Sequence, residues 1–240
     1  MAADALFFGA HPDDIELTSG GLAARLASHG HRVVLVDLTR GEGASRGVPE
    51  QRAREAAEAA RILGVAERVN LGLADCGLSR HDRSQLALIV TCVRTHRPAL
   101  VVAPDRDDAH PDHVEAHHLV SRACYLAGLA RYPASGERHR PARLMYALYR
   151  GAARAQLVVD VTGVWEKRQA AIAAHASQFD PAAGPATYLT DPLFAVELEA
   201  RARIWGASIG AAFGEGYRMC GPVPVADARS LLARVAGNDR

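Results

Sequence analysis

The chain has 240 residues, of which 49% are hydrophobic and 23% are charged, and its formal net charge at pH 7 is +1. This length and composition are typical of one large domain with a sizeable core, so we expect a single domain over residues 1–240. Because the charge is nearly balanced, the chain has no basic field that attracts a polyanion. We therefore expect no nucleic acid partner and favour a small neutral or acidic substrate.

The N-terminus and the cysteines indicate the compartment. Met1 leads into a short apolar run without the basic segment and cleavage site of a signal peptide. No apolar run approaches the roughly 18 residues that a membrane span requires. The cysteines form no Cys-x-x-Cys pair, which favours unpaired thiols in a reducing cytoplasm. They stand at positions 76, 92, 124 and 220. We expect a cytoplasmic protein without a membrane partner.

Short β-rich apolar runs alternate with stretches of helical period along the first half of the chain. The expected strands are 5–9, 33–38, 68–71 and 100–103, and the expected helices are 17–29, 49–63, 84–95 and 114–127. This alternation predicts an α/β fold with a Rossmann-like, doubly wound, mostly parallel sheet and helices on both faces.

The second half continues the pattern less regularly. Strands are expected at 144–149 and 156–161, and the tail is then interpreted as helical, with helices at 163–177 and 193–208. The expected loops are 41–48, 132–141 and 180–188. No stretch is long enough to be a linker between domains.

Two short polar clusters follow expected strands. His-Pro-Asp-Asp at 11–14 comes directly after the first strand, and His-Pro-Asp-His at 110–113 comes a few residues after the fourth. Open parallel sheets bind ligands at the carboxyl ends of their strands, and in the common 3-2-1-4-5 order the first and fourth strands are neighbours at the switch point. We therefore expect both clusters to face one crevice.

The residue types in the clusters suit a metal. The proline after the first histidine of each cluster favours a helical first turn, which puts residues three apart on one side. His11 then pairs with Asp14, and His110 pairs with His113. Two imidazoles and a carboxylate suit a catalytic Zn²⁺ with a fourth position for water. The alternative is a set of helix caps and turns, which explains one cluster more easily than two at neighbouring strand ends.

The two motifs resemble those of the LmbE/PIG-L family of zinc-dependent N-acetylglucosaminyl deacetylases, over nearly the entire chain. Within that family, several segments are similar to the branch that deacetylates N-acetylglucosaminyl malate in bacillithiol synthesis. These segments are Leu-Thr-Arg-Gly-Glu-Gly at 38–43, Arg-Gly at 46–47, Arg52 with Glu-Ala-Ala at 55–57, Ala-x-x-Ser-Gln-Phe at 174–179 and Arg-Ala-Arg-x-x-Gly at 201–206. Other family substrates stay open, namely chitobiose, a mycothiol precursor and antibiotic pseudoaglycones.

The resemblance implies a role for each cluster residue. The implied zinc ligands are His11, Asp14 and His113, and Fe²⁺ is an alternative metal for the same ligands. Asp13 is the implied base that takes a proton from water. His110 faces the developing oxyanion and is held by Asp112, as a carboxylate orients a catalytic histidine. Either Asp13 or His110 protonates the leaving amine.

The substrate contacts are also implied by resemblance. Arg52 and Arg140 match family positions at the substrate, and arginine suits the carboxylates of malate. Glu42, in the loop after the second strand, is expected in the wall of the sugar site. The chain departs from its relatives at Ala109, where an arginine is common, and lacks an aromatic hydroxyl near residue 193, for which Tyr188 is the nearest substitute. The family resemblance further implies a homo-oligomer such as a hexamer.

Two rival functions remain. Gly-Ala-Ser-Ile-Gly at 206–210 matches the nucleophile elbow of serine hydrolases, with Ser208 as nucleophile, but the elbow needs a strand before it and a helix after it. A non-catalytic doubly wound binding module is the second rival, because the fold hosts many functions. His117 is a further histidine on the helix after His113, and we interpret it as a structural residue rather than a support of the metal site.

Overall fold

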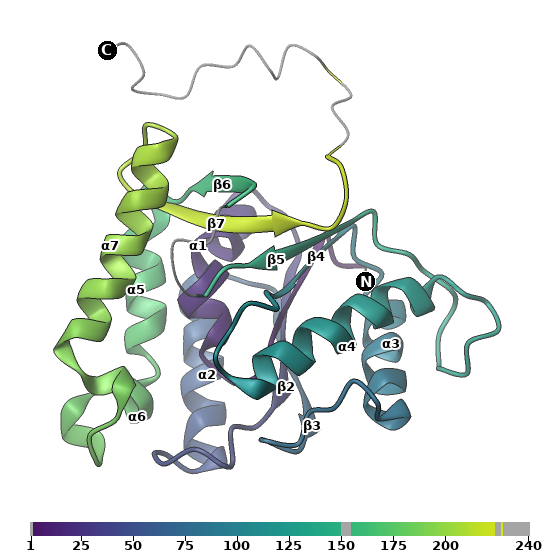
Figure 1. Ribbon diagram of the computed structural model, residues 1–240, viewed down its shortest axis with the longest axis horizontal. Helices are drawn as coiled ribbons and strands as arrows, with labels where there is room; N and C mark the ends of the chain where they lie inside the picture. Colours follow the sequence, from purple (N-terminus) through teal and green to yellow (C-terminus); the bar gives the residue numbers. More distant parts are fainter. Residues whose placement is uncertain (1, 150–154, 224–226, 228–240) are drawn as a thin grey trace.

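The core of the protein is one seven-stranded sheet with helices on both faces (Figure 1). The computed structural model describes residues 2–149, 155–223 and 227. The strands, in chain order, are β1 (Ala5–Gly9), β2 (Val33–Thr39), β3 (Glu67–Leu73), β4 (Leu100–Pro104), β5 (Arg143–Ala147), β6 (Leu157–Asp160) and β7 (Gly214–Met219). The helices are α1 (Asp14–Ser28), α2 (Pro49–Leu63), α3 (Arg83–His96), α4 (Pro111–Ala127), α5 (Trp165–Ala173), α6 (Ala176–Phe179) and α7 (Pro192–Ser208). Short 3-10 turns lie at Thr162–Val164, Pro181–Ala183 and Tyr188–Thr190.

The strand order β3-β2-β1-β4-β5-β7-β6 confirms the predicted doubly wound arrangement. The first five strands of this order are parallel, and Ala5 of β1 pairs with Leu100 of β4. The carboxyl ends of β1 and β4 therefore meet at the switch point, where the chain reverses its direction of sheet growth. This register brings the two polar clusters together.

Two apolar layers hold the helices to the sheet. On one face, α3 and α4 bury side chains such as Ile89 and Leu119 against β1, β2 and β4. On the other face, α1, α2 and α5 bury side chains such as Ile15 and Leu63. Helices thus cover both faces, as predicted, and the central parallel strands β1, β2 and β4 are mainly apolar because neither of their faces meets water.

Helix α2 has the bounds predicted for it because local sequence signals specify both of its ends. Pro49 stands at the first helical position of α2, and Gly64 ends it in the left-handed conformation with φ 77°. Proline fixes φ for a helix start and glycine adopts positive φ without strain, so both ends are specified in the sequence.

Two predictions for the tail were wrong. The helix expected over 163–177 is divided into a 3-10 turn, α5 and α6, and the chain leaves helical geometry at His175, which has ψ 54°. The segment 214–219 is a strand, β7, that runs antiparallel to β5 and β6. Two glycines conceal this strand, and Gly216 is required because a Cβ there would lie 2.6 Å from the Trp205 ring.

The apolarity of the helices and the state of the cysteines complete the description of the fold. Among the residues that the structure describes, no helix has the length and apolarity needed to cross a membrane. All four cysteines are free thiols, Cys92 and Cys124 in the core and Cys76 and Cys220 at the surface.

Candidate active site

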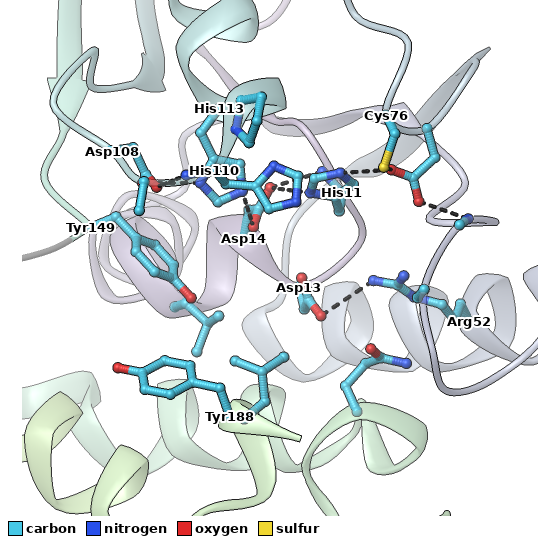
Figure 2. Close-up of a pocket in the computed structure, with 18 residues that line it drawn as sticks. His11, Asp13, Asp14, Arg52, Cys76, Asp108, His110, His113, Tyr149 and Tyr188 are labelled. Carbon is cyan, nitrogen blue, oxygen red and sulfur yellow. Dashed lines mark hydrogen bonds and ion pairs between the residues drawn. The ribbon is translucent and has the colours of Figure 1, made fainter. Parts of the chain in front are cut away.

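The two polar clusters line one cavity of about 440 Å³ at the switch point of the sheet (Figure 2). His11 follows β1, and Asp13 is the N-cap of α1. His110 is the N-cap of α4, where its ring Nδ1 accepts a hydrogen bond from the backbone N–H of Asp112. The starts of two helices therefore project their first polar side chains into the same space.

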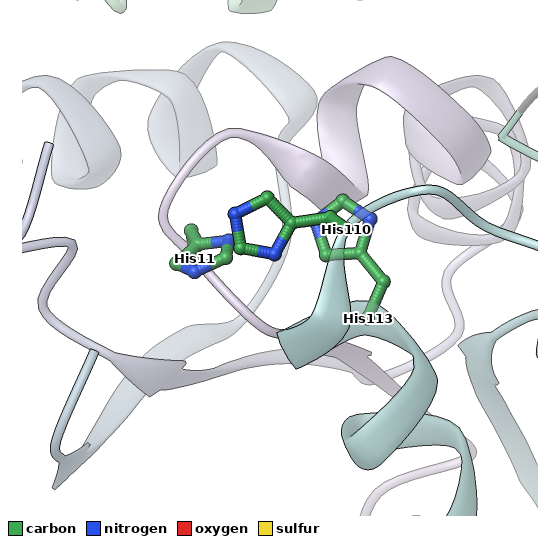
Figure 3. A group of neighbouring side chains, drawn as sticks. All are labelled: His11, His110 and His113. Atoms are coloured by element: carbon green, nitrogen blue, oxygen red, sulfur yellow. The ribbon is translucent and has the colours of Figure 1, made fainter. Parts of the chain in front are cut away.

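Asp14 lies between the two predicted histidine ligands. Its Oδ2 is 3.4 Å from Nδ1 of His11, and its Oδ1 is 3.1 Å from Nε2 of His113. All three side chains are buried. The ring of His110 lies against both imidazoles (Figure 3), and His11, His110 and His113 each offer a nitrogen within 4.8 Å of the others.

The other nitrogen of each predicted ligand contacts an outer carboxylate. Nδ1 of His113 is 2.9 Å from Oδ2 of Asp108. Nε2 of His11 is 3.1 Å from Oδ1 of Asp75 and 3.4 Å from Oδ2 of Asp112. Such outer carboxylates orient metal-binding histidines and fix their tautomers. They leave Nδ1 of His11 and Nε2 of His113 facing the carboxylate of Asp14.

The electrostatics of the cluster suit a cation. Burial disfavours charge on His11, yet the nearby carboxylates, with Asp112 the largest contributor, raise the pKa of its imidazole to about 12. Burial also opposes charge on His113, but Asp14 and Asp108 raise its pKa to about 10. Both shifts reflect a surplus of buried negative charge, which a divalent metal offsets. Nitrogen and oxygen donors with outer carboxylates fit Zn²⁺, and they fit Fe²⁺ as well.

Asp13 combines a strained backbone with a buried carboxylate. Its φ of 123° lies in a region that non-glycine residues rarely adopt, and such strain is found at functional sites. Burial raises the pKa of its carboxyl to about 6, although the charge of Arg52 opposes the shift. A carboxylate with a pKa near neutrality is suited to accept and return a proton.

Arg52 contacts the protein rather than open space. Its Nη2 donates to the carbonyl of Pro12 at 2.7 Å and to Oδ2 of Asp13 at 3.3 Å, and its Nη1 donates to the carbonyl of Gly41. The side chain lines the cavity but is buried. These contacts make Arg52 a positioning residue for Asp13, and they leave few donors for the carboxylates of a substrate.

Three other expectations for the site need correction. Arg140 is exposed outside the cavity lining, stacked 4.4 Å over the ring of Tyr125, because its loop turns toward the far end of α4. Glu42 is also outside the lining, since its carboxylate accepts from the backbone N–H groups of Arg40 and Asp75. The Asp112 carboxylate faces His11 and the backbone N–H of Cys76, so it does not hold the ring of His110.

One wall of the cavity comes from the segment after α6. Tyr188 and Leu189 line it, and the Tyr188 hydroxyl donates to Oε2 of Glu197 at 2.7 Å. Buried Arg46 attaches this segment to the loop after β2 through the carbonyls of Ser177 and Pro185. Ala109 also lines the cavity.

Sequence reasoning missed three residues of the site. Asp75 and Asp108 support the histidines, and the half-buried ring of Tyr149 has its centroid 5.4 Å from that of His113. A lone Asp in a loop gives no periodic signal, and Tyr149 was interpreted only as part of a strand. His117 is a structural residue, as expected, because its Nδ1 lies 3.1 Å from the carbonyl of Pro104.

The serine-hydrolase alternative is wrong. Ser208 is the last residue of α7, whereas a nucleophile elbow needs a strand before the serine and a helix after it. Its hydroxyl donates to the carbonyl of Trp205 at 2.6 Å, in the last turn of the same helix.

Comparison with known proteins agrees with this site. The family model of PIG-L, described as GlcNAc-PI de-N-acetylase, matches residues 6–124, which contain both polar clusters. A 1D-myo-inositol 2-acetamido-2-deoxy-alpha-D-glucopyranoside deacetylase from Rhodococcus jostii is 30% identical over 80% of this chain and 89% of its own length. The chain therefore belongs to the PIG-L (LmbE) family of deacetylases, and the predicted enzyme class, a metal-dependent N-deacetylase, is confirmed.

Solved structures extend the match to the whole fold. A conserved protein from Thermus thermophilus is 35% identical, with a TM-score of 0.86 over 94% of this chain and 98% of its own. The N,N'-diacetylchitobiose deacetylase from Pyrococcus horikoshii is 25% identical, with a TM-score of 0.79 over 90% of this chain and 84% of its own.

Proposed function

We propose that this protein hydrolyses the N-acetyl group of an N-acetylglucosaminyl conjugate, with Zn²⁺ bound by His11, Asp14 and His113. The observation that carries the proposal is the orientation of the two imidazoles. Each contacts Asp14 with one ring nitrogen and an outer carboxylate with the other. Zn²⁺ held by these residues would polarise the acetamide carbonyl and lower the pKa of a bound water to about 7.

Asp13 is the proposed general base. It takes a proton from the attacking water, whose oxygen forms the new bond to the acetyl carbon. Arg52 keeps the carboxylate in position, and burial keeps the pKa of Asp13 at about 6, so that the proton is accepted and then released.

His110 is the proposed donor to the oxyanion. Its Nδ1 accepts from the backbone N–H of Asp112, so Nε2 is the nitrogen that is able to face the substrate. A donor aimed at the developing negative charge stabilises the tetrahedral intermediate. The C–N bond then breaks, the proton that Asp13 took from water passes to the amine, and acetate and the free amino sugar leave. His110 keeps its Nε2 proton, because its Nδ1 is an acceptor and the ring is neutral.

The aglycone is proposed from sequence motifs. N-acetylglucosaminyl malate is the first candidate because of the segments at 38–47 and 174–179 that resemble the bacillithiol branch. The inositol conjugate named for the Rhodococcus relative and the diacetylchitobiose named for the Pyrococcus relative are the alternatives, together with antibiotic pseudoaglycones. Because Arg52 is engaged by the protein and Arg140 lies elsewhere, recognition of the malate carboxylates needs other donors.

The test is amine release from these conjugates and from free N-acetylglucosamine, with the zinc and iron content of the protein measured. We expect turnover that is lost on chelation and restored by Zn²⁺, with the malate conjugate the best substrate. Turnover of another conjugate alone keeps the mechanism and rejects the malate assignment. Chelator-resistant turnover, or none from any acetylated sugar, rejects the proposed function.

A further inference from the structure

The lining of the catalytic cavity is polar at one end and apolar at the other. Figure 2 shows Arg52 and Cys76 on one side of Asp14 and Tyr149 on the other. Leu17 also lines the cavity, and Tyr149 packs against the apolar cluster to which Leu17 belongs. Leu17 and Tyr149 together form an apolar corner of the cavity.

The apolar corner lies beside the reacting groups. Leu17 is one turn after Asp13 and Asp14, and its backbone N–H donates to the carbonyl of Asp13 at 3.1 Å. Because helical side chains lean toward the N-terminus, the Leu17 side chain covers the surface next to these two carboxylates. The Tyr149 ring has its centroid 5.4 Å from that of His113. A group held between the proposed base and the proposed metal ligands therefore contacts the corner.

The Leu17 side of the corner is fixed in place. Leu17 is 2% exposed, and it packs against Ile172 of α5 and against Phe194 and Leu198 of α7. Its carbonyl accepts a hydrogen bond at 2.6 Å from Nη2 of buried Arg168, which holds the helix backbone at this turn. The side chain therefore has no free space into which it moves when a larger group enters the cavity.

Little free volume lies behind the Tyr149 side of the corner. Tyr149 and Asp14 both border a void of only about 10 Å³. A cavity needs about 10–15 Å³ of such volume to hold one water, so this void has no room for a further carbon of a substrate. Both sides of the corner are thus closely packed.

The geometry of the amide directs its methyl group to this corner. In the proposed function the carbonyl carbon lies beside Asp13, and its oxygen faces His110. Its nitrogen carries the sugar, whose hydroxyls suit the polar end of the cavity. The methyl group takes the remaining direction, where apolar side chains remove it from water.

We infer that Leu17 and Tyr149 determine which acyl group is removed, by enclosing the methyl of an acetyl group and excluding longer acyl chains. The inference rests on the proposed function and adds the residues that limit the size of the acyl group. One extra methylene in a close-fitting apolar pocket changes kcat/KM by about 10- to 200-fold. We therefore expect the parent to hydrolyse N-formyl and N-acetyl substrates and to discriminate against N-propionyl substrates by this factor.

The acyl preference of two variants tests the corner. The substrates are the N-formyl, N-acetyl, N-propionyl and N-butyryl forms of glucosaminyl malate and of glucosamine, assayed by amine release. Leu17→Ala should raise the ratio of kcat/KM for N-propionyl to kcat/KM for N-acetyl by at least about 10-fold. Tyr149→Leu should raise the same ratio, so the inference is still tested if Leu17→Ala does not fold.

Two matched variants separate this effect from a loss of stability. Leu22→Ala makes the same change on the same helix, at a buried residue outside the cavity lining. It should lower the urea midpoint of unfolding and keep the acetyl preference. Tyr149→Phe keeps the ring and should also keep the acetyl preference, whatever its effect on kcat. A purely structural role of Leu17 would give Leu17→Ala and Leu22→Ala the same acyl profile.

Binding of the product acids is a readout that does not depend on turnover. In titrations followed by ligand-observed NMR, the parent should bind acetate more tightly than butyrate. Leu17→Ala should bind butyrate more tightly than the parent does, whereas Leu22→Ala should bind both acids as the parent does.

Two results overturn the inference. Equal turnover of N-acetyl and N-butyryl substrates by the parent means that the corner sets no limit. Unchanged acyl ratios in both Leu17→Ala and Tyr149→Leu, with the parent active on N-acetyl substrates, reject the corner and keep the proposed function. Absence of turnover with all four acyl groups rejects the proposed function, and the binding of acetate and butyrate then decides the role of the corner separately.

Discussion

The outer carboxylates of the two proposed metal ligands His11 and His113 are predicted to contribute unequally to metal affinity. Among the described residues, the outer nitrogen of His113 has one carboxylate neighbour, Asp108 at 2.9 Å, whereas the outer nitrogen of His11 has two, Asp75 at 3.1 Å and Asp112 at 3.4 Å. Loss of the single carboxylate beside His113 should therefore weaken metal binding more than loss of one of the two carboxylates beside His11.

Asparagine is the informative replacement because it has one acceptor oxygen. Asp108 uses both oxygens, one for His113 and one for the backbone N–H of His110. Asp75 also uses both, for His11 and for the backbone N–H of Gly43. Losing such a support weakens metal binding or activity by about 10- to 100-fold. We expect about 100-fold for Asp108→Asn, or about 2.7 kcal/mol, and about 10-fold for Asp75→Asn, or about 1.4 kcal/mol.

The assay is competition for Zn²⁺ with a chromophoric chelator at constant pH. Asp107→Asn is the matched control, because Asp107 is adjacent in sequence but its carboxylate is exposed and pairs with Arg218 at 2.7 Å. Its zinc affinity should equal that of the parent. A larger loss for Asp75→Asn than for Asp108→Asn, or no loss for either, refutes the assignment of these carboxylates as supports.

Four further predictions concern catalysis and stability. Asp13→Asn should keep its zinc and lower kcat by at least about 100-fold, and an active variant overturns the role of Asp13 as base. Arg52→Met should lower kcat more than it raises KM, because it releases Asp13 rather than substrate; a change confined to KM contradicts this role. Ser208→Ala should leave kcat and chelator sensitivity unchanged, and loss of activity revives the serine mechanism. Arg68→Met should lower the free energy of unfolding, measured by urea titration, by about 3–5 kcal/mol, because Glu16 and Asp37 stay buried without their cation. Arg61→Met is the control, since it removes an exposed ion pair with Glu58 and should have little effect on stability. Equal losses of stability in the two variants refute the reasoning.

The sequence predicted the parallel half of the fold because its signals are local. Apolar runs, a proline at the start of α2 and glycine at its end each act within a few residues. Strand β7 was not predicted because distant contacts stabilise it. Glu215 of β7 accepts hydrogen bonds from the backbone N–H groups of Gly21 and Leu22 in α1, almost 200 residues away in sequence. No short window of sequence contains that information.

In the site, too, features that depend on local sequence were predictable, and features that depend on the path of the chain were not. The juxtaposition of His11, Asp14 and His113 was predictable because spacing within a helical first turn and strand order are both visible in sequence. Their supports were not, because a run such as Arg-Asp-Asp at 106–108 does not reveal which aspartate turns inward. In the structure Asp108 faces His113 and Asp107 faces Arg218. Arg140 was predicted to contact the substrate only because its position matches one in the family. In the structure its loop places the side chain over the ring of Tyr125, outside the cavity lining.

The most direct test of the metal assignment is anomalous diffraction at the zinc absorption edge from crystals of the zinc-loaded protein. We predict one peak within about 2.0–2.2 Å of Nδ1 of His11, Nε2 of His113 and a carboxylate oxygen of Asp14. A peak at Nε2 of His11, between Asp75 and Asp112, or no peak in the cavity, contradicts the account.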